Sequence, residues 1–130
     1  MDATLQTKQE NLYALELGKL LHEHRGGDVV VMDMAPLDFW TDFFIIATVT
    51  SNTHMTGLER HIKEYIRENG LEILNRSRKP EGDDEWSLLD LGGIVIHLMT
   101  AKSRSFYELE RLWSAAPLIF RGEAHSSKSS

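Results

Sequence analysis

The sequence predicts a single-domain α/β fold in which helices flank a mixed β-sheet of about five strands. Two apolar runs of strand length, residues 29–32 (Val-Val-Val-Met) and 43–47 (Phe-Phe-Ile-Ile-Ala), are typical of strands covered on both faces. A helical pattern and a glycine-centred hairpin follow them, so helices and strands alternate along the chain. We expect the domain to span residues 1–120 and the polar, Ser-rich residues 121–130 to form a disordered tail.

A first helix is predicted ahead of these strands. Thr7 and Glu10 have the spacing of a capping box within this helix, and the pair Gly26-Gly27 is expected to end it. Its apolar residues recur at helical spacing, at Tyr13, Leu17, Leu20 and Leu21.

A second helix is predicted after residues 51–53 (Ser-Asn-Thr), any of which could be its N-cap, and it should end at Asn69-Gly70. This helix would form a crossover to a third strand at residues 71–76. Its charged face, which includes Glu59, is interpreted as solvated and without function. The opposite face is apolar and carries Met55, Leu58, Ile62, Tyr65 and Ile66.

A hairpin follows a polar loop at residues 77–84. Residues 86–91 and 94–99 have strand character and flank Gly92-Gly93, which suits a two-residue type I′ turn. After the hairpin, a short helix is expected from about residue 103 to residue 112.

The two faces of this hairpin differ, because side chains alternate across a strand. Pairing around the turn places Ser87 opposite Leu98 and Leu89 opposite Ile96, on a face that should be core. The other face is mixed and carries Trp86, Leu88, Asp90, Val95, His97 and Met99.

Two interpretations of the mixed face remain open. Helices could cover it, with His97 satisfied by Asp90 or a backbone group. Alternatively it binds a protein, for which an exposed tryptophan and methionine beside a few polar anchors are the expected composition. The acidic residues just before it would attract a basic partner; they are Glu81, Asp83, Asp84 and Glu85.

Composition excludes several classes of function. The formal net charge of -6 argues against a protein that binds nucleic acid mainly by neutralising phosphates. The sequence has 0 cysteines, which excludes disulfides and thiolate metal sites. Apolar runs are too short to cross a bilayer and the first residues lack a targeting signal, so we expect a cytoplasmic protein without membrane contact.

The hairpin and the segment after it resemble a known family. Residues 86–99 (Trp-Ser-Leu-Leu-Asp-Leu-Gly-Gly-Ile-Val-Ile-His-Leu-Met) and 104–113 (Arg-Ser-Phe-Tyr-Glu-Leu-Glu-Arg-Leu-Trp) closely resemble the signature of the ribosomal silencing factors, the Iojap-like family. The resemblance covers about residues 12–113. The main departure is Val49, which stands where the family usually has a glycine, and Gly93 is a milder one, where an Asp is common. Upstream segments that resemble the same family are residues 28–33, 41–46 and 50–54.

The resemblance implies a fold related to nucleotidyltransferases but without their catalytic carboxylates, hence no enzyme, no cofactor and no small-molecule substrate. It implies a homodimer when free, and binding to the large ribosomal subunit through the universal ribosomal protein fourteen. Bound there, the protein would block joining of the small subunit and repress translation when nutrients are scarce. The implied docking surface includes Trp86, Leu88, Asp90, His97, Met99, Tyr107 and Trp113.

A nucleotidyltransferase-like enzyme or nucleotide-binding protein is the alternative, because residues 50–52 at a helix N-terminus could hold a phosphate. Nucleotidyl transfer needs clustered carboxylates for magnesium, however, and Asp28 and Asp33 should point to opposite faces of one strand. None of the 6 histidines has the spacing of a shared metal site. Ser87 should point away from His97, which argues against a catalytic triad.

Overall fold

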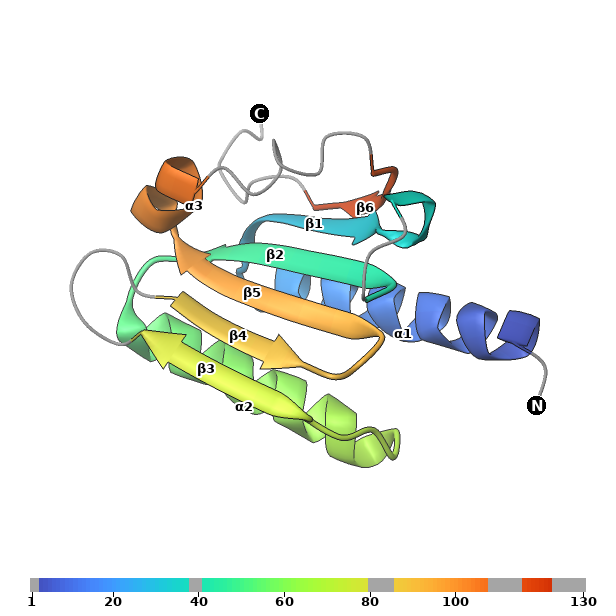
Figure 1. Cartoon of the computed structure of the whole chain (residues 1–130). Coiled ribbons are helices and arrows are strands. Elements are labelled where there is room, and N and C mark those ends of the chain that lie inside the picture. Colours follow the sequence, from blue (N-terminus) through green and yellow to red (C-terminus); the bar gives the residue numbers. More distant parts are fainter. Residues whose placement is uncertain (1–2, 38–40, 80–85, 108–115, 123–130) are drawn as a thin grey trace.

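The computed structural model describes residues 3–37, 41–79, 86–107 and 116–122, and Figure 1 shows how their helices and strands are arranged. In chain order the elements are α1 (Ala3–Glu23), β1 (Gly27–Asp33), the 3₁₀ helix η1 (Ala35–Leu37), β2 (Phe43–Val49), α2 (Asn52–Glu68), β3 (Asn75–Lys79), β4 (Trp86–Asp90), β5 (Ile94–Thr100), α3 (Ala101–Tyr107) and β6 (Leu118–Arg121).

The strands form one mixed sheet in the order β3-β4-β5-β2-β1-β6. The pair β2 and β5 is parallel, whereas all other neighbouring strands in this sheet are antiparallel. The helix α2 carries the chain from the central β2 to the edge strand β3. The predicted fold class, a mixed sheet flanked by helices, is confirmed, and the sheet has one strand more than predicted.

Both long helices lie against the same face of the sheet (Figure 1). Leu17 and Leu21 of α1 and Ile62 of α2 are fully buried there against β-strand side chains such as Ile45 and Ile96. The opposite sheet face, which we call the second face, has its own apolar cluster, to which neither α1 nor α2 contributes. Its buried members are Val30, Met32, Met34, Phe44, Ile46, Val95, Met99 and Ala116.

Both ends of α2 follow local sequence signals, and α1 ends at Glu23, just before the predicted stop at Gly26-Gly27. Ser51 is the N-cap of α2, and its side chain accepts a hydrogen bond of 3.0 Å from the backbone N–H of His54. Asn69 is the C-cap, as predicted. The predicted capping box in α1 is wrong, because the helix already begins at Ala3 and Thr7 lies inside it.

The third strand was predicted at residues 71–76 but lies at Asn75–Lys79, and residues 71–74 are irregular. Pairing with β4 sets this register, since Asn75 lies opposite Asp90 and the N–H of Leu74 donates to the Asp90 carbonyl. The predicted loop at residues 77–84 therefore starts too early. A local apolar run does not reveal which residues will find a strand partner.

The hairpin has the predicted register, with Ser87 opposite Leu98 and Leu89 opposite Ile96. Its turn differs from the prediction: Gly92 has a φ of +97° and Gly93 has no positive φ. A positive φ at the first central residue alone defines type II′, whereas type I′ requires it at both.

The C-terminal elements correct two further expectations. The helix α3 begins at Ala101, two residues earlier than predicted, and its expected continuation to residue 112 falls outside the described residues. The four residues that directly follow Pro117 form β6. This strand was not predicted, and it pairs with β1. Arg121, assigned to the tail by the sequence prediction, is the last residue of β6.

Val49, where the resemblance led us to expect a glycine, is the buried last residue of β2. Among the described non-glycine residues, only Arg25 and Asp28 have a positive φ. The chain therefore makes no left-handed turn at Val49, and a β-branched residue fits there without strain.

Glu59 is an exception on the predicted solvated face of α2, whose other charged residues, Arg60, Lys63, Glu64, Arg67 and Glu68, are exposed as predicted. Its side chain is 3% exposed and lies between α2 and the sheet. The hydroxyl of Ser87 donates to one carboxylate oxygen, and Nη2 of Arg76 lies 2.7 Å from the other. Because a buried carboxylate needs such partners, Glu59 is a polar link between α2, β3 and β4.

Candidate protein-binding surface

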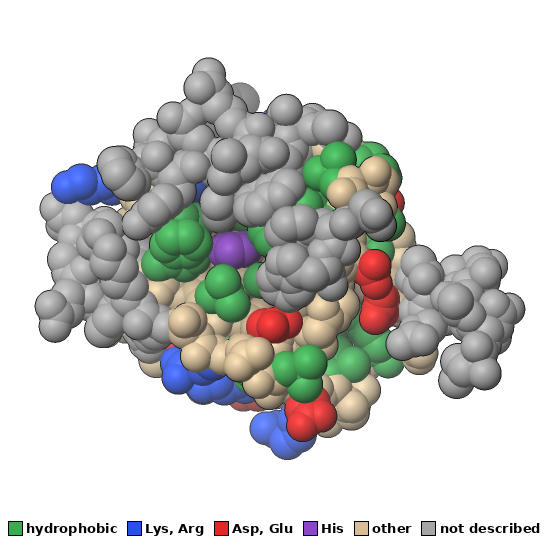
Figure 2. Space-filling model, in the orientation of Figure 1, with side chains coloured by type: hydrophobic (Ala, Val, Ile, Leu, Met, Phe, Trp, Pro, Cys, Tyr) green, Lys and Arg blue, Asp and Glu red, His purple; other side chains and the backbone are tan. Residues whose placement is uncertain are grey.

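The second face carries the mixed hairpin residues that the sequence singled out. Cross-strand pairs join Trp86 to Met99, Leu88 to His97 and Asp90 to Val95, so all of these side chains share one side of β4 and β5. Figure 2 shows this side of the molecule, where a histidine side chain lies among hydrophobic side chains and an acidic one. The predicted alternation of the hairpin is confirmed.

The side chains of the two strands on this surface differ in their exposure to solvent. Trp86, Leu88 and Asp90 on β4 are half-buried and reach solvent. On β5, Met99 is fully buried and His97 is 4% exposed. The expectation of an exposed methionine is therefore wrong: β5 lies between β4 and β2 in the sheet, and Met99 packs within the apolar cluster of the second face. The surface that a partner can reach directly is the β4 row.

His97 is held by ring contacts and one hydrogen bond. Nε1 of Trp86 donates to Nδ1 of His97 over 3.2 Å, and the ring centroids of Phe44 and His97 are 4.9 Å apart. Burial lowers the pKa of His97 to about 4, so its imidazole is neutral at physiological pH. The expected partner, Asp90, instead accepts the backbone N–H of Gly92 over 2.8 Å.

The remaining predicted contact residues cannot be placed on this surface. Tyr107 is the last residue of α3, but its side chain is not among the described ones. Trp113 and the acidic residues Glu81, Asp83, Asp84 and Glu85 lie outside the described residues.

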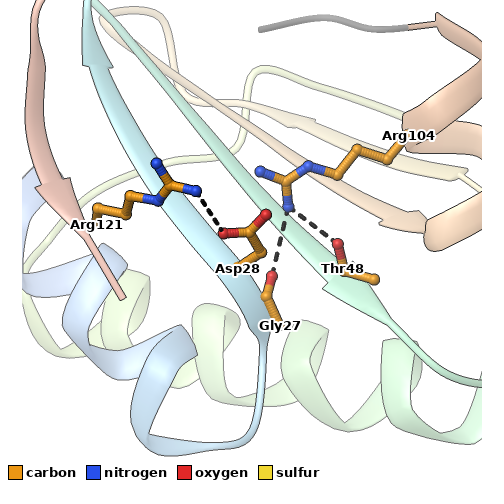
Figure 3. A network of polar contacts seen from close by, with 5 residues as sticks. All are labelled: Gly27, Asp28, Thr48, Arg104 and Arg121. Atoms are coloured by element: carbon orange, nitrogen blue, oxygen red, sulfur yellow. Dashed lines mark hydrogen bonds and ion pairs between the residues drawn. The ribbon is translucent and has the colours of Figure 1, made fainter. Parts of the chain in front are cut away.

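An arginine that sequence reasoning did not single out anchors α3 (Figure 3). Nη1 of Arg104 lies 3.0 Å from Oγ1 of Thr48 and 3.4 Å from the carbonyl oxygen of Gly27. Beside it, Arg121 of β6 reaches Asp28 over 3.5 Å. These contacts join residues far apart in the sequence, so no local pattern could have indicated them. They fix the start of the C-terminal segment to the end of the central strands.

A cavity of about 250 Å³ lies at the turn end of the hairpin. Burial raises the pKa of Glu10 in its wall to about 7, and a hydrogen bond and the charge of Asp42 add to this effect. The Glu10 carboxylate fills the space beside Gly93 and would clash with a Cβ added there. The other lining residues are Gln9, Tyr13, Asn69, Gly70, Leu71, Leu91 and Ile94.

The geometry bears on three arrangements that catalysis could use: a metal site, a catalytic triad and a phosphate site at a helix N-terminus. Within the described ranges, no group of three or more His, Asp or Glu residues could hold a metal ion. Ser87 points to Glu59 on the helix-covered face, away from His97, which rules out a triad of the two. The N-terminus of α2 is capped by Ser51, which matches the plain N-cap interpretation of residues 50–52. None of the helices in the described segments is long and apolar enough to span a membrane.

Comparison with known proteins identifies relatives in sequence and in structure. Residues 6–130 match the family described as "Ribosomal silencing factor during starvation". Ribosomal silencing factor RsfS of Bacillus subtilis is 37% identical over 98 residues, which cover 74% of this chain and 80% of the relative. The mouse protein named "Mitochondrial assembly of ribosomal large subunit protein 1" is 33% identical over 103 residues, which cover 75% of this chain and 43% of that protein. A crystal structure of a Chromobacterium violaceum protein matches with a TM-score of 0.67 and 26% identity, over 90% of this chain and 93% of that one.

Proposed function

Because the chain belongs to the family of ribosomal silencing factors, we propose that it docks on the large ribosomal subunit and keeps the small subunit from joining. The proposed partner on the large subunit is the universal ribosomal protein fourteen, as the family resemblance implies. The name of the mouse relative also refers to the large ribosomal subunit. In this proposal the protein represses translation by occupying space, without a cofactor.

The observation that carries the proposal is the β4 row of the second face. Trp86 and Leu88 present half-buried apolar side chains, and Asp90 adds a polar group at the end of the row. Half-buried tryptophan beside aliphatic and polar neighbours is the composition of a protein-binding centre. The two long helices pack against the other sheet face, so neither of them covers this row.

Charge favours a protein partner over ribosomal RNA. The net charge of -6 opposes binding that depends on phosphate neutralisation. Ribosomal proteins are commonly basic, and a basic protein surface would be attracted to this chain over the distance of a Debye length. A protein contact on the large subunit therefore agrees with both the composition and the second face.

Co-sedimentation with purified large subunits tests the proposal. The wild-type protein should migrate with the subunits, and Trp86→Ala should bind about 30-fold more weakly, which corresponds to about 2 kcal/mol for a central aromatic residue. Leu12→Ala is the matched control, because Leu12 is a 52% exposed apolar residue on α1, at the opposite side of the sheet. If wild-type protein stays at the top of the gradient, docking on the large subunit is refuted.

A subunit-joining assay tests the consequence of docking. Light scattering should show that wild-type protein reduces the joining of small and large subunits, whereas Trp86→Ala has a much smaller effect at equal concentration. Normal joining in the presence of saturating wild-type protein would contradict steric occlusion while leaving docking intact.

The oligomeric state, the absence of enzymatic activity and the cellular compartment are three further parts of the proposal, and each has a simple check. We expect a homodimer when the protein is free, and a monomer in sedimentation equilibrium would contradict it. The relatives are named as silencing factors and not as enzymes, so magnesium-dependent nucleotide turnover should be absent. Fractionated cells should contain the protein in the cytoplasm, together with the ribosomes.

A further inference from the structure

The hydrogen bond between Trp86 and His97 determines where His97 carries its proton. An indole N–H can only donate, so Nδ1 of His97 must be the acceptor of the 3.2 Å bond from Trp86. A neutral imidazole that accepts at Nδ1 carries its hydrogen on Nε2. Because burial holds the pKa of His97 near 4, this neutral form persists throughout the physiological pH range.

The Nε2 atom of His97 is buried and has no hydrogen-bond partner in the described part of the chain. Buried donors are nearly always paired in native proteins, and an unpaired one costs about 1–3 kcal/mol. The residue lies on β5 beside the β4 row, directly across from the half-buried Leu88. An unsatisfied donor at this place points to an acceptor that belongs to the docked state.

We infer that Nε2–H of His97 is a specificity-determining donor of the docking surface, and that it binds a carbonyl oxygen of the protein partner. Trp86 is then more than an apolar contact, because it is the positioning residue that sets the tautomer of His97. The inference rests on the proposed function.

The chemistry of the surroundings selects the acceptor. A phosphate or carboxylate would approach a chain of net charge -6 and would lie near the side chain of Asp90. A neutral imidazole offers such an anion no compensating charge. A backbone or side-chain amide carbonyl needs only a neutral donor. Because Nε2 is buried and unpaired in the free protein, a partner that brings no suitably placed carbonyl leaves this donor unsatisfied and is disfavoured.

Nuclear magnetic resonance of the ring nitrogens tests the tautomer in the free protein. The ¹⁵N shifts of wild-type His97 should show the proton on Nε2. Trp86→Phe keeps an aromatic ring but removes the indole N–H, so it should give a mixture of tautomers. A wild-type ring with its proton on Nδ1 would overturn the inference.

Co-sedimentation with large subunits tests the donor. His97→Phe keeps a ring without a donor and should weaken binding about five- to tenfold. In His97→Gln the amide nitrogen can take the place of Nε2, so this variant should restore most of the affinity. Equal binding of wild type and His97→Phe, or equal losses in both variants, would overturn the donor role.

Two further outcomes separate the possible failures. If wild-type protein does not bind large subunits, the proposed function is refuted, and so is the proposed carbonyl acceptor on the partner. The tautomer of His97 is still decided, because the NMR experiment on the free protein does not depend on binding. Repeating the comparison with isolated ribosomal protein fourteen should give the same loss for His97→Phe. If His97→Phe loses affinity for whole subunits but not for the isolated protein, the acceptor lies on RNA, and the proposal of a protein carbonyl is refuted.

Discussion

Replacing Glu10 with glutamine should remove a pH dependence from the stability of this protein. In the folded state, burial and Asp42 raise the pKa of Glu10 from 4.5 to about 7. The folded state therefore binds this proton more tightly than the unfolded state does. The contribution of Glu10 is fully present below about pH 4.5 and is lost as the pH rises to about 7, so wild-type stability should fall across this interval.

The two pKa values set the size of the effect. The interval from 4.5 to about 7, at roughly 1.4 kcal/mol per pH unit, gives an upper value of about 3.5 kcal/mol. Glu10 is only partly buried, and solvent screens part of its interaction with Asp42. We therefore expect a loss of about 1–2 kcal/mol between pH 5 and pH 8.

Urea unfolding followed by circular dichroism at several pH values measures this loss at constant protein concentration. Glu10→Gln should show a flatter profile and should be more stable than wild type at pH 8, because a neutral amide replaces a carboxylate beside Asp42. Glu68→Gln is the control, since Glu68 is exposed on α2 and its replacement should leave the wild-type slope unchanged. Parallel profiles for wild type and Glu10→Gln would refute the reasoning.

Two other substitutions test the fold. Arg76→Met leaves the buried carboxylate of Glu59 with a smaller set of partners and should lower the free energy of unfolding by about 3 kcal/mol. Urea unfolding measures this change, and a loss below about 1 kcal/mol would contradict the importance of the link between Arg76 and Glu59. Gly92→Ala forces a side chain onto a φ of +97° and should cost about 1–2 kcal/mol. Gly57→Ala in α2 meets nothing within 4 Å and should instead stabilise the protein by up to about 1 kcal/mol, so equal melting temperatures for the two alanine variants would argue against the turn geometry.

The parts of the fold that the sequence predicts correctly are those specified by neighbouring residues. Ser51 caps α2 through a bond to a residue three positions away, and alternation around Gly92-Gly93 sets the hairpin register. By contrast, β6 has only four residues, and what makes it a strand is the edge of β1, far away in the sequence. Local preference cannot identify a strand whose cause is tertiary pairing.

The candidate surface shows the same limit. Strand alternation correctly placed Trp86 and His97 on one face, but it did not identify them as a bonded pair. Directly opposite His97 lies Leu88, and Trp86 is its diagonal neighbour on β4. Diagonal neighbours are within reach of large aromatic side chains, so this rule was the available signal. No sequence signal indicated that Glu59 is buried, because its burial depends on the docking of α2 against β3 and β4.

The strand order also determines when the protein can become functional during its own synthesis. The central strand β2 is made early, but one of its two neighbours is β5, which leaves the ribosome only after α2, β3 and β4. The second neighbour of β1 is β6, the last of the elements in the described residues. Contacts between such distant segments form late and slowly. A nascent chain thus has no complete second face, and β4 gains its partner on that face only when β5 has emerged.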